Sequence, residues 1–373
     1  MKHLIYADNA ATTQMDVDVF EAMKPYLLHE YGNASQPYSF ARQPKKAIQE
    51  ARETIASCIG ALPEEIYFTS GGTESDNWAI KGIAFRNYDH RATITTAFEH
   101  HAVLHACEAI ERLGCPVAYM LPDKRGFVSP DSLERYITDE TFLVSVMYAN
   151  NELGSIQPIK ELCKVAHDHG ALFHTDAVQA VGHVAINVND LGVDMLSASA
   201  HKFNGAKGVG FLYIRTGTTL PPYADGGAQE HGLRAGTENV AGIVSMAVAL
   251  KKNVNDLDKN QRHILKLEGL LLQALNKSGI PYVRNGGDHT LPGVISLSFD
   301  GKDGEAILHR MDLMGVCIST GSACDSKNTE ISHVLQAIRM PESLAKGTIR
   351  ISLGKNNTAD DIDTIVTALR KIL

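Results

Sequence analysis

Lys202 lies in a sequence context that can make a lysine amine reactive. It ends the run Ser197-Ala-Ser-Ala-His-Lys202, and a glycine-containing stretch follows it. Partial burial and neighbouring cations lower the pKa of a lysine, and its unprotonated amine can then form a Schiff base with an aldehyde. A lysine alone is ordinarily a solvated surface residue, so this interpretation depends on the residues that accompany it.

Asp176 is the first of these companions. It ends the run Ala-Leu-Phe-His-Thr-Asp, which predicts a buried strand. A buried carboxylate needs a positive partner, because an unpaired charge is costly to remove from water. A protonated pyridine nitrogen is such a partner, and this pairing strengthens pyridoxal phosphate as an electron acceptor. Gln179, one helical turn onward, can reach the phenolic oxygen of the same cofactor.

A second companion is the segment Phe68-Thr-Ser-Gly-Gly-Thr-Glu-Ser-Asp-Asn77. It reads as a strand, a glycine turn and a helix start with hydroxyl and acidic residues in its first turn. Free N–H groups at a helix N-terminus bind phosphate, and Gly71 and Gly72 permit close approach of the backbone. No Gly-Lys-Ser/Thr follows, so the segment is not a Walker loop. A capped helix start without a ligand is the alternative.

Cys324 differs from the other five cysteines. It follows Ser319-Thr-Gly-Ser-Ala and precedes Asp-Ser-Lys-Asn, a run too polar and too rich in small residues for the core. An exposed thiol, partly ionised near neutral pH, can attack sulfur. A solvent-facing cysteine with no role is the alternative. The cysteines form no CxxC pair and are widely spread, which excludes a disulfide framework.

The elements that must position these residues alternate between apolar β-branched runs and amphipathic segments. The expected strands are 66–69, 93–96, 117–121, 143–148, 172–176, 195–199 and 210–213, with helices such as 40–59 and 159–169 between them. This alternation predicts an α/β fold with a mostly parallel sheet, whose ligands gather beyond the carboxyl ends of the strands.

The last third of the chain predicts a smaller α+β unit. It reads as one long helix over 253–278, then a strand at 294–299, a helix at 304–314, the Cys324 loop, a strand at 349–352 and a last helix from Thr358. Chains of 373 residues ordinarily divide into two units. We expect a large unit over 14–257 and a small unit made of 1–13 and 258–373, which carries the Cys324 loop.

The net charge of −8 gives no basic footprint for nucleic acid or anionic membranes. No apolar run is long enough to cross a bilayer, and the N-terminus lacks the features of a secretion signal. A cytoplasmic protein is therefore expected. His167, His169 and His174 lie close in sequence, but a glycine separates the last from the others, so no metal site is expected.

An ordered set of motifs resembles the cysteine desulfurases of the NifS/IscS kind, in the class V aminotransferase family. The motifs run nearly from end to end: ADNAATT (7–13), FTSGGTESDN (68–77), EH (99–100), NNE (150–152), HTDAVQ (174–179), SASAHK (197–202), RAGTEN (234–239), STGSAC (319–324) and IRISL (349–353). The loop around Cys324 is similar to that of the longer-loop desulfurases. The resemblance implies a fold type I (aspartate aminotransferase-like) transferase with a seven-stranded sheet.

By this resemblance, most of the site residues surround pyridoxal 5'-phosphate. Lys202 would hold the cofactor as a Schiff base, Asp176 would pair with its ring nitrogen, and His100 would stack on the ring and act as an acid–base. The remaining contacts would come from Gln179 and Asn151 at the ring, from Gly72, Thr73, Ser199 and His201 at the phosphate, and from Thr237 of a partner subunit in a homodimer.

The resemblance also implies a reaction. L-cysteine would bind through Arg350, with Asn33 and Asn151 close to it, and would leave as L-alanine, while Cys324 would keep the sulfur as a persulfide. An acceptor protein, such as an iron–sulfur scaffold or a tRNA thiolation enzyme, would receive that sulfur. The chain departs from the family pattern at 34–41, at 225–231 and at Ala200. The alternatives are a small amino-acid aminotransferase, a selenocysteine lyase and a non-catalytic assembly subunit.

Overall fold

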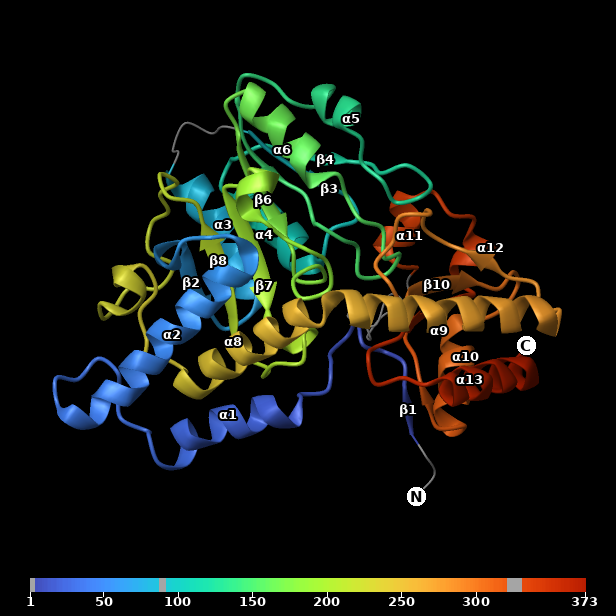
Figure 1. The fold of residues 1–373 in the computed structure, drawn as a ribbon. Helices are drawn as coiled ribbons and strands as arrows, with labels where there is room; N and C mark the ends of the chain where they lie inside the picture. The colour runs from blue at the N-terminus through green and yellow to red at the C-terminus, as the bar shows by residue number, and fades with distance from the viewer. Residues whose placement is uncertain (1–3, 87–91, 321–330) are drawn as a thin grey trace.

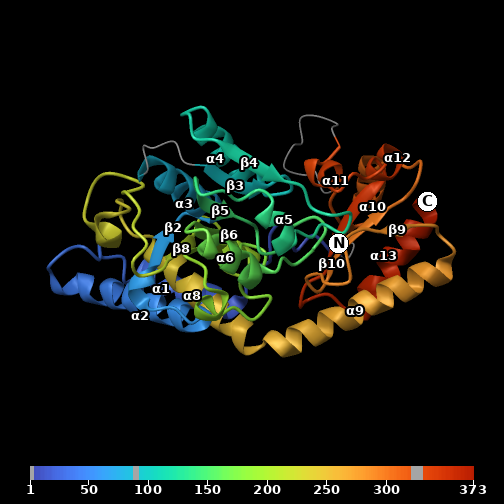
Figure 2. The same cartoon turned by 90° about the horizontal axis from the view of Figure 1, so that it is seen from above.

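The protein has a large part built on a seven-stranded sheet and a smaller part built on a three-stranded sheet. The computed structural model describes residues 4–86, 92–320 and 331–373. The two parts lie side by side, and the long helix α9 (Leu257–Ser278) runs from one to the other (Figure 1, Figure 2). The predicted α/β class with a mostly parallel seven-stranded sheet is confirmed.

Among the described residues, six of the seven strands of the large sheet run in one direction. The spatial order is β2 (Ile66–Thr69), β8 (Gly210–Ile214), β7 (Met195–Ser199), β6 (Leu172–Asp176), β5 (Thr141–Ser145), β3 (Ala92–Thr96) and β4 (Val117–Met120). Strand β8 is antiparallel to both of its neighbours, and the other pairs of adjacent strands are parallel. The carboxyl ends of β2, β7, β6, β5 and β3 therefore meet at one edge.

Helices cover both faces of this sheet, as a parallel sheet requires. One face packs against α3 (Gly72–Arg86) and α4 (His101–Glu111) through Met195, Leu212 and Leu143. The opposite face carries the main core, with Phe173, Leu196 and Phe211 among its members. The helices on that side are α1 (Val17–Leu28), α2 (Arg42–Ile59), α5 (Pro130–Glu134), α6 (Ile159–Asp168), α7 (Val188–Leu191) and α8 (Val240–Asn255).

The smaller part has a separate core. Its sheet has the order β12 (Thr348–Ser352), β10 (Val294–Ser298) and β9 (Val283–Arg284), and β1 (Ile5–Tyr6) pairs with β11 (Val316–Cys317) close by. Side chains from α9, α10 (Gly304–Leu313) and α13 (Ala359–Ile372) pack on the sheet. The short helices α11 (His333–Ala337) and α12 (Glu342–Ala345) instead contribute Val334, Leu335 and Ala345 to the core of the large part.

The prediction of one helix over 253–278 was wrong. Helix α8 ends at Asn255 and α9 begins at Leu257, with Asp256 between them. Asp256 caps both helices: its N–H donates to the Lys252 carbonyl, and its own carbonyl accepts from Asn260 N. Aspartate is a poor interior helix residue because its side chain competes for backbone groups, which favours a break at this position.

The strand expected at 143–148 also differs, since β5 ends at Ser145. Beyond it, the N–H of Met147 donates 2.9 Å to the buried carboxylate of Glu99. The Glu99 side chain, just after β3, thus takes the place of a backbone hydrogen-bond partner in the sheet.

In the described residues, no helix is long and apolar enough to span a membrane.

Candidate active site

The sheet brings several of the predicted residues to its carboxyl edge. Strand β6 ends at Asp176, β7 leads into a short 3₁₀ turn, Ala200–Lys202, and β2 leads into the glycine turn before α3. His100 lies just beyond β3, at the start of α4. Four segments distant in sequence therefore meet because their strands run in the same direction.

The Lys202 amine is directed at the N-terminal segment. Its Nζ donates to the carbonyl oxygens of Ala10, at 2.6 Å, and Ala11, at 2.9 Å. The turn that carries it is held from both sides: Thr13 N donates 2.9 Å to the His201 carbonyl, and a ring nitrogen of His183 lies 2.8 Å from the Lys202 carbonyl. The lysine is half-buried, as a reactive amine requires.

Asp176 is a nearly buried carboxylate, 5% exposed. Its Oδ1 accepts from Val178 N at 2.9 Å, and no other hydrogen bond from the described residues reaches the carboxylate. Burial raises the pKa of Asp176 to about 6, while the Val178 N–H and the charge of Lys202 lower it. A cationic ligand beside Asp176 would stabilise its ionised form.

His100 is the N-cap of α4. Its Nδ1 accepts from Ala102 N at 3.1 Å, which leaves the ring proton of the neutral imidazole on Nε2. Burial, together with the charges of Lys202 and the neighbouring histidines, lowers the pKa of His100 to about 4. The imidazole is therefore neutral at neutral pH.

The predicted phosphate-binding turn packs closely on the Lys202 segment. A Cβ added to Gly72 would come within 2.5 Å of Val178 Cγ2, and one added to Gly210 would come within 2.7 Å of Gly71 Cα. Ser199 lies beside Gly71, since a Cβ on that glycine would be 3.4 Å from the Ser199 Oγ. Only glycine allows this approach of the turn to Val178, which follows β6, and of β8 to the turn.

The other two predicted phosphate ligands differ in exposure. The Thr73 side chain is exposed, in the first turn of α3. His201 is half-buried, and its Nδ1 lies 3.1 Å from Thr12 Oγ1. Burial lowers the pKa of His201 to about 4, with the charges of Lys202 and Lys207 acting in the same direction. Neutral His201 can therefore interact with an anion as a hydrogen-bond donor.

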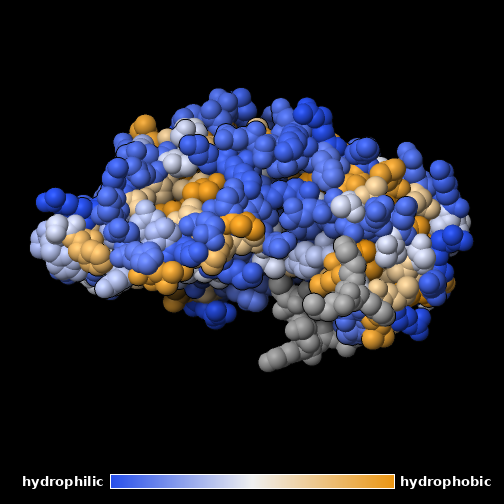
Figure 3. Space-filling model, turned by 60° about the horizontal axis from the view of Figure 1, so that its bottom comes forward, coloured by the Kyte–Doolittle hydropathy of each residue, from blue (hydrophilic) through white to orange (hydrophobic). Residues whose placement is uncertain are grey.

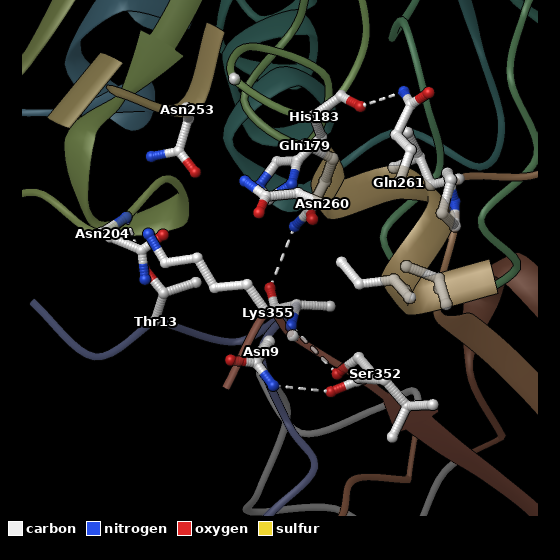
Figure 4. A pocket seen from close by; sticks show the side chains of 18 of the residues that line it. Asn9, Thr13, Gln179, His183, Asn204, Asn253, Asn260, Gln261, Ser352 and Lys355 are labelled. Atoms are coloured by element: carbon white, nitrogen blue, oxygen red, sulfur yellow. Dashed lines mark hydrogen bonds between the residues drawn. The ribbon is translucent and has the colours of Figure 1, made fainter. Parts of the chain in front are cut away.

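Gln179 lies between the Lys202 turn and a cavity that is open to solvent. Its Nε2 donates 3.0 Å to the Ala10 carbonyl, the same oxygen that accepts from Lys202. Figure 4 shows Gln179 and His183 on one side of this cavity and Asn9 and Ser352 on the other. Residues of the large part and of the small part thus both line this cavity.

Arg350, on β12, is buried, and two of its three guanidinium nitrogens have partners among the described residues. Its Nη2 donates 2.6 Å to Asp8 Oδ1 and its Nη1 donates 2.9 Å to the Asn151 carbonyl, while Nε has no partner among the described residues. The Arg350 backbone also exchanges two hydrogen bonds with Ser319, at 2.6 and 3.0 Å. Arg350 and Asn151 are thus in contact, and both lie beside the start of the Cys324 loop.

The structure does not bring Asn33 or Thr237 into contact with Lys202. Asn33 is half-buried and its Oδ1 accepts from Ser35 N at 2.9 Å. Thr237 is exposed, and the adjacent Glu238 accepts 3.2 Å from the Ser35 hydroxyl. The contacts of Ser35 with Asn33 and Glu238 place these two predicted residues near each other, and no hydrogen bond among the described residues links either one to the lysine turn.

Cys324, which the sequence predicts to receive sulfur, lies outside the described residues. Of the described cysteines, all are free thiols; Cys107, Cys115 and Cys163 are buried, and Cys58 and Cys317 are partly buried. Burial raises the pKa of Cys58 to about 11, so its thiol is protonated at neutral pH.

Sequence reasoning missed a layer of buried polar residues between α3 and the sheet. His174 Nδ1 lies 2.8 Å from the Ser145 hydroxyl and its Nε2 lies 3.0 Å from the Ser197 hydroxyl, with Asp76 Oδ1 at 3.6 Å. Burial, followed by the charge of Asp176, raises the pKa of Asp76. Burial likewise raises the pKa of Glu99 to about 8. Burial therefore favours the protonated form of both carboxyls, and Glu99 is mostly protonated at neutral pH.

The three histidines that lie close in sequence have separate partners. His167 pairs with Asp194 at 2.8 Å and His169 with Glu134 at 3.1 Å, whereas His174 belongs to the buried layer. Within the ranges that the structure describes, no group of histidine, cysteine and acidic side chains is arranged to hold a metal ion.

Comparisons with known proteins agree with this geometry. Residues 5–365 match the family model described as aminotransferase class-V, so the chain belongs to that family. It is 48% identical to the cysteine desulfurase IscS of Dictyoglomus turgidum, over all of this chain and 95% of that protein. It is 46% identical to the cysteine desulfurase IscS of Methanosarcina thermophila, over 99% and 92% of the two chains.

Solved structures give the same result. A NifS-like protein superposes with a TM-score of 0.94 at 37% identity over 99% of both chains. The protein SspA, solved in complex with cysteine, superposes with a TM-score of 0.85 at 37% identity, over 95% of this chain and all of that one.

The family uses pyridoxal 5'-phosphate, and the described residues fit that cofactor. Asp176 offers a buried carboxylate with one hydrogen-bond donor, which suits a cationic ring nitrogen. The glycine turn places free N–H groups of α3 next to Ser199, which suits a phosphate. Lys202 lies between these two features on the same sheet edge.

Proposed function

We propose that the protein is a cysteine desulfurase that converts L-cysteine to L-alanine and passes the sulfur to Cys324. The observation that carries this proposal is the joint position of Lys202 and Arg350. The lysine donates to the carbonyls of Ala10 and Ala11, while Asp8, in the same segment, binds the Arg350 guanidinium. An amine for the cofactor and a cation for a carboxylate therefore face one short stretch of chain.

The cofactor would be held by the residues at the sheet edge. Lys202 would bind its aldehyde carbon, Asp176 its ring nitrogen and Gln179 its phenolic oxygen, with His100 and Asn151 next to the ring. Gly72, Thr73, Ser199 and His201 would bind the phosphate. Bound there, the cofactor supplies an electron sink for the bonds at the substrate Cα.

Two side chains of the site can handle protons. Lys202 Nζ, once released from the cofactor, can take the proton from the substrate Cα, because the amine is half-buried and its partners in the N-terminal segment are carbonyl oxygens. His100 carries its proton on Nε2 and has its Nδ1 occupied by Ala102 N. A neutral ring with one fixed N–H can donate a proton without competing for the carboxylate of the substrate.

The substrate would be oriented by Arg350, whose Nε has no partner among the described residues and can donate to a carboxylate. Asn33 and Asn151 would lie near the bound amino acid. The Cys324 thiolate would then attack the substrate sulfur: a sulfur–sulfur bond forms, the carbon–sulfur bond breaks, and Cβ gains a proton. L-cysteine and one thiol thus give L-alanine and one persulfide, with atoms and electrons balanced.

We propose a homodimer in which Thr237 of each subunit reaches the cofactor phosphate of the other. The exposed side chains along 17–40 support this, because Val17 is 79% exposed, Tyr31 71% and Leu28 57%. Figure 3 shows apolar patches on the side of the molecule where α1 and α2 lie. Isolated apolar side chains are ordinary on a surface, but a cluster of this kind marks an interface.

The separate core around β10 and β12 supports a division into a large unit, 14–257, and a small unit, 1–13 with 258–373.

Sulfur from Cys324 would pass to an acceptor protein for iron–sulfur cluster, thio-cofactor or tRNA thiolation chemistry.

The experiment is to incubate the purified protein with L-cysteine and a reducing thiol and to measure alanine and sulfide. Equal amounts are expected, and both should disappear in Cys324→Ala and in Lys202→Ala. Cys58→Ser, at a partly buried thiol in α2, serves as the control and should keep both products. Full sulfide release by Cys324→Ala, or a wild-type protein that stays colourless with pyridoxal 5'-phosphate, would overturn the proposal.

A further inference from the structure

The loop that carries Thr237 is held in an unfavourable backbone conformation. We call residues 228–239 the Thr237 loop. Within it, Glu230 and His231 have φ angles of 45° and 59°, in the left-handed region that residues with a Cβ rarely adopt. Such conformations persist where the surroundings fix them, and they concentrate at functional sites. The contacts of the loop therefore show what it is fixed to.

The first anchor is a buried ion pair between Glu230 and Arg52 of α2. Arg52 Nη2 donates 2.7 Å to Glu230 Oε1 and Nη1 donates 2.9 Å to Oε2, with the side chains 9% and 5% exposed. Glu230 Oε2 also accepts 2.8 Å from Phe68 N. The strained residue is thus bonded to β2, just before the strand enters the phosphate-binding turn.

The second anchor joins Arg234 to Glu74, in the first turn of α3. Arg234 Nε donates 2.8 Å to Glu74 Oε1 and Nη2 donates 3.2 Å to Oε2. Glu74 Oε2 in turn accepts 3.0 Å from Ser70 N, within the phosphate-binding turn itself. The Glu74 carboxylate therefore bridges the turn that would bind phosphate and the loop that carries Thr237.

Beyond Arg234, the loop is fixed again. Glu238 accepts 3.2 Å from the Ser35 hydroxyl, and Asn239 caps α8 through its Oδ1, which accepts 3.1 Å from Gly242 N. The exposed Thr237 lies between these fixed points. A shift of the Ser70–Glu74 turn would thus be transmitted through Arg234 to the residue proposed to reach the partner subunit.

We propose that Glu74 and Arg234 are positioning residues that couple the two cofactor sites of the homodimer. Phosphate binding at one turn fixes Glu74, Glu74 fixes the Thr237 loop through Arg234, and that loop completes the phosphate site of the partner. By reciprocity, each filled site strengthens binding at the other. The inference rests on the proposed function, since it requires the dimer and a Thr237 that acts across its interface.

The first test is a titration of the cofactor-free dimer with pyridoxal 5'-phosphate, followed by its absorbance. The wild type should bind cooperatively, with a Hill coefficient above 1. Arg234→Gln and Glu74→Gln should bind about 10-fold more weakly, within the range typical of coupled sites, and without cooperativity. Arg234→Lys, which keeps the charge, should recover part of the affinity.

The molecule offers a matched control in the small part. Arg284 Nη2 donates to Glu268 Oε1 at 2.5 Å, and Glu268 Oε2 accepts 2.9 Å from Gly293 N, so this pair also joins an arginine to a backbone N–H through a carboxylate, with one arginine hydrogen bond in place of two. The exposures are also similar, 33% and 9% against 26% and 10%. Arg284→Gln should lower thermal stability by as much as Arg234→Gln, yet leave the cofactor titration unchanged. An equal effect of both variants on the titration would mean that Arg234 is merely structural.

Mixed dimers separate this inference from the proposed function. One subunit carries Lys202→Ala, so that alanine is formed only in the other, and the cofactor requirement of that one site is measured. Thr237→Ala should raise the requirement only when it stands in the Lys202→Ala subunit. Arg234→Gln should raise it from either subunit.

If Thr237→Ala acts only from the subunit that keeps Lys202, the proposed contact across the interface is wrong. If Thr237→Ala behaves as expected but Arg234→Gln acts from one subunit alone, the dimer stands and the coupling is wrong.

Discussion

The two charged regions of the site differ in the partners of their buried charged groups. At the edge of the large sheet, Asp176 is a buried carboxylate with one backbone donor, and Asp76 and Glu99 lie behind it. In the small part, Arg350 is a buried cation that already has a carboxylate partner, Asp8. The large part thus holds a carboxyl group with no ion pair among the described residues, and the small part holds a cation with one carboxylate partner and an Nε that has no partner among those residues.

This difference indicates what each region receives. A buried carboxylate whose pKa burial raises becomes fully charged only when a cation arrives, so the Asp176 region suits a pyridinium. A guanidinium with an unpartnered Nε can accept a second carboxylate without a new desolvation cost, so the Arg350 region suits an amino acid. The substitutions below are expected to separate the two roles.

The largest effect is expected at the carboxylate. Asp176→Asn should lower kcat for alanine formation by about 10²- to 10³-fold, because a preorganised charge opposite the cofactor is lost. The measurement is the rate of alanine formation per bound cofactor. Asp76→Asn is the control within the same layer and should have a far smaller effect, because burial raises the pKa of that carboxyl and disfavours its charged form. Comparable losses in both would refute the view that only Asp176 carries the charge.

The same carboxylate should make the stability of the cofactor-free protein depend on pH. Burial raises the pKa of Asp176 to about 6 from 3.8, so between these values the folded protein keeps a proton that the unfolded chain has lost. The free energy of unfolding should therefore fall as pH rises through this window, by up to about 3 kcal/mol, since one pKa unit corresponds to about 1.4 kcal/mol. The wild type and Asp176→Asn should differ by this slope in urea denaturation, because His100 and His201, whose lowered pKa values act in the opposite direction, contribute equally to both proteins. An equal pH dependence of the two proteins would assign the slope to another group.

At Arg350, the geometry of the guanidinium should matter more for substrate binding than its charge. Arg350→Lys keeps the charge but loses the fork, so KM for L-cysteine should rise about 10- to 100-fold, the effect of one or two charge-assisted hydrogen bonds. The kcat should change much less. Steady-state kinetics separates the two, and a loss confined to kcat would place Arg350 away from the substrate carboxylate.

The smallest effect is expected at the partner of Arg350. Asp8→Asn keeps the shape and one acceptor but removes the charge, so the free energy of unfolding should fall by about 1–2 kcal/mol. L-cysteine should protect this variant against denaturation more than it protects the wild type, because the substrate carboxylate restores the lost partner. Asp300→Asn, at an exposed residue of the small part, should show neither effect.

The sequence was sufficient for those features that depend on local pattern. Strands β2, β6 and β7 have the bounds that their apolar runs predict, so the residue pattern alone assigns Asp176 and the Lys202 turn to strand ends. A strand end is visible locally, because the run of apolar residues stops and a polar residue follows.

Pairings between distant segments could not be predicted in this way. Nothing in the sequence around Arg350 indicates Asp8, and nothing around Glu74 indicates Arg234. The buried layer of Asp76 and His174 was equally invisible, because polar residues on a helix predict exposure until a facing strand is known. The break at Asp256 was missed because the apolar period continues on both sides of it.

The backbone pairing of Arg350 with Ser319 has a consequence for protein engineering. The loop that contains Cys324 starts from a point clamped by two hydrogen bonds to a core strand, whatever its later residues are. Segments of other lengths can therefore be grafted after Thr320 without displacing the guanidinium. The same fold would then accept segments of different length, so that the distance the thiol can reach is chosen independently of the site that contains Lys202 and Arg350.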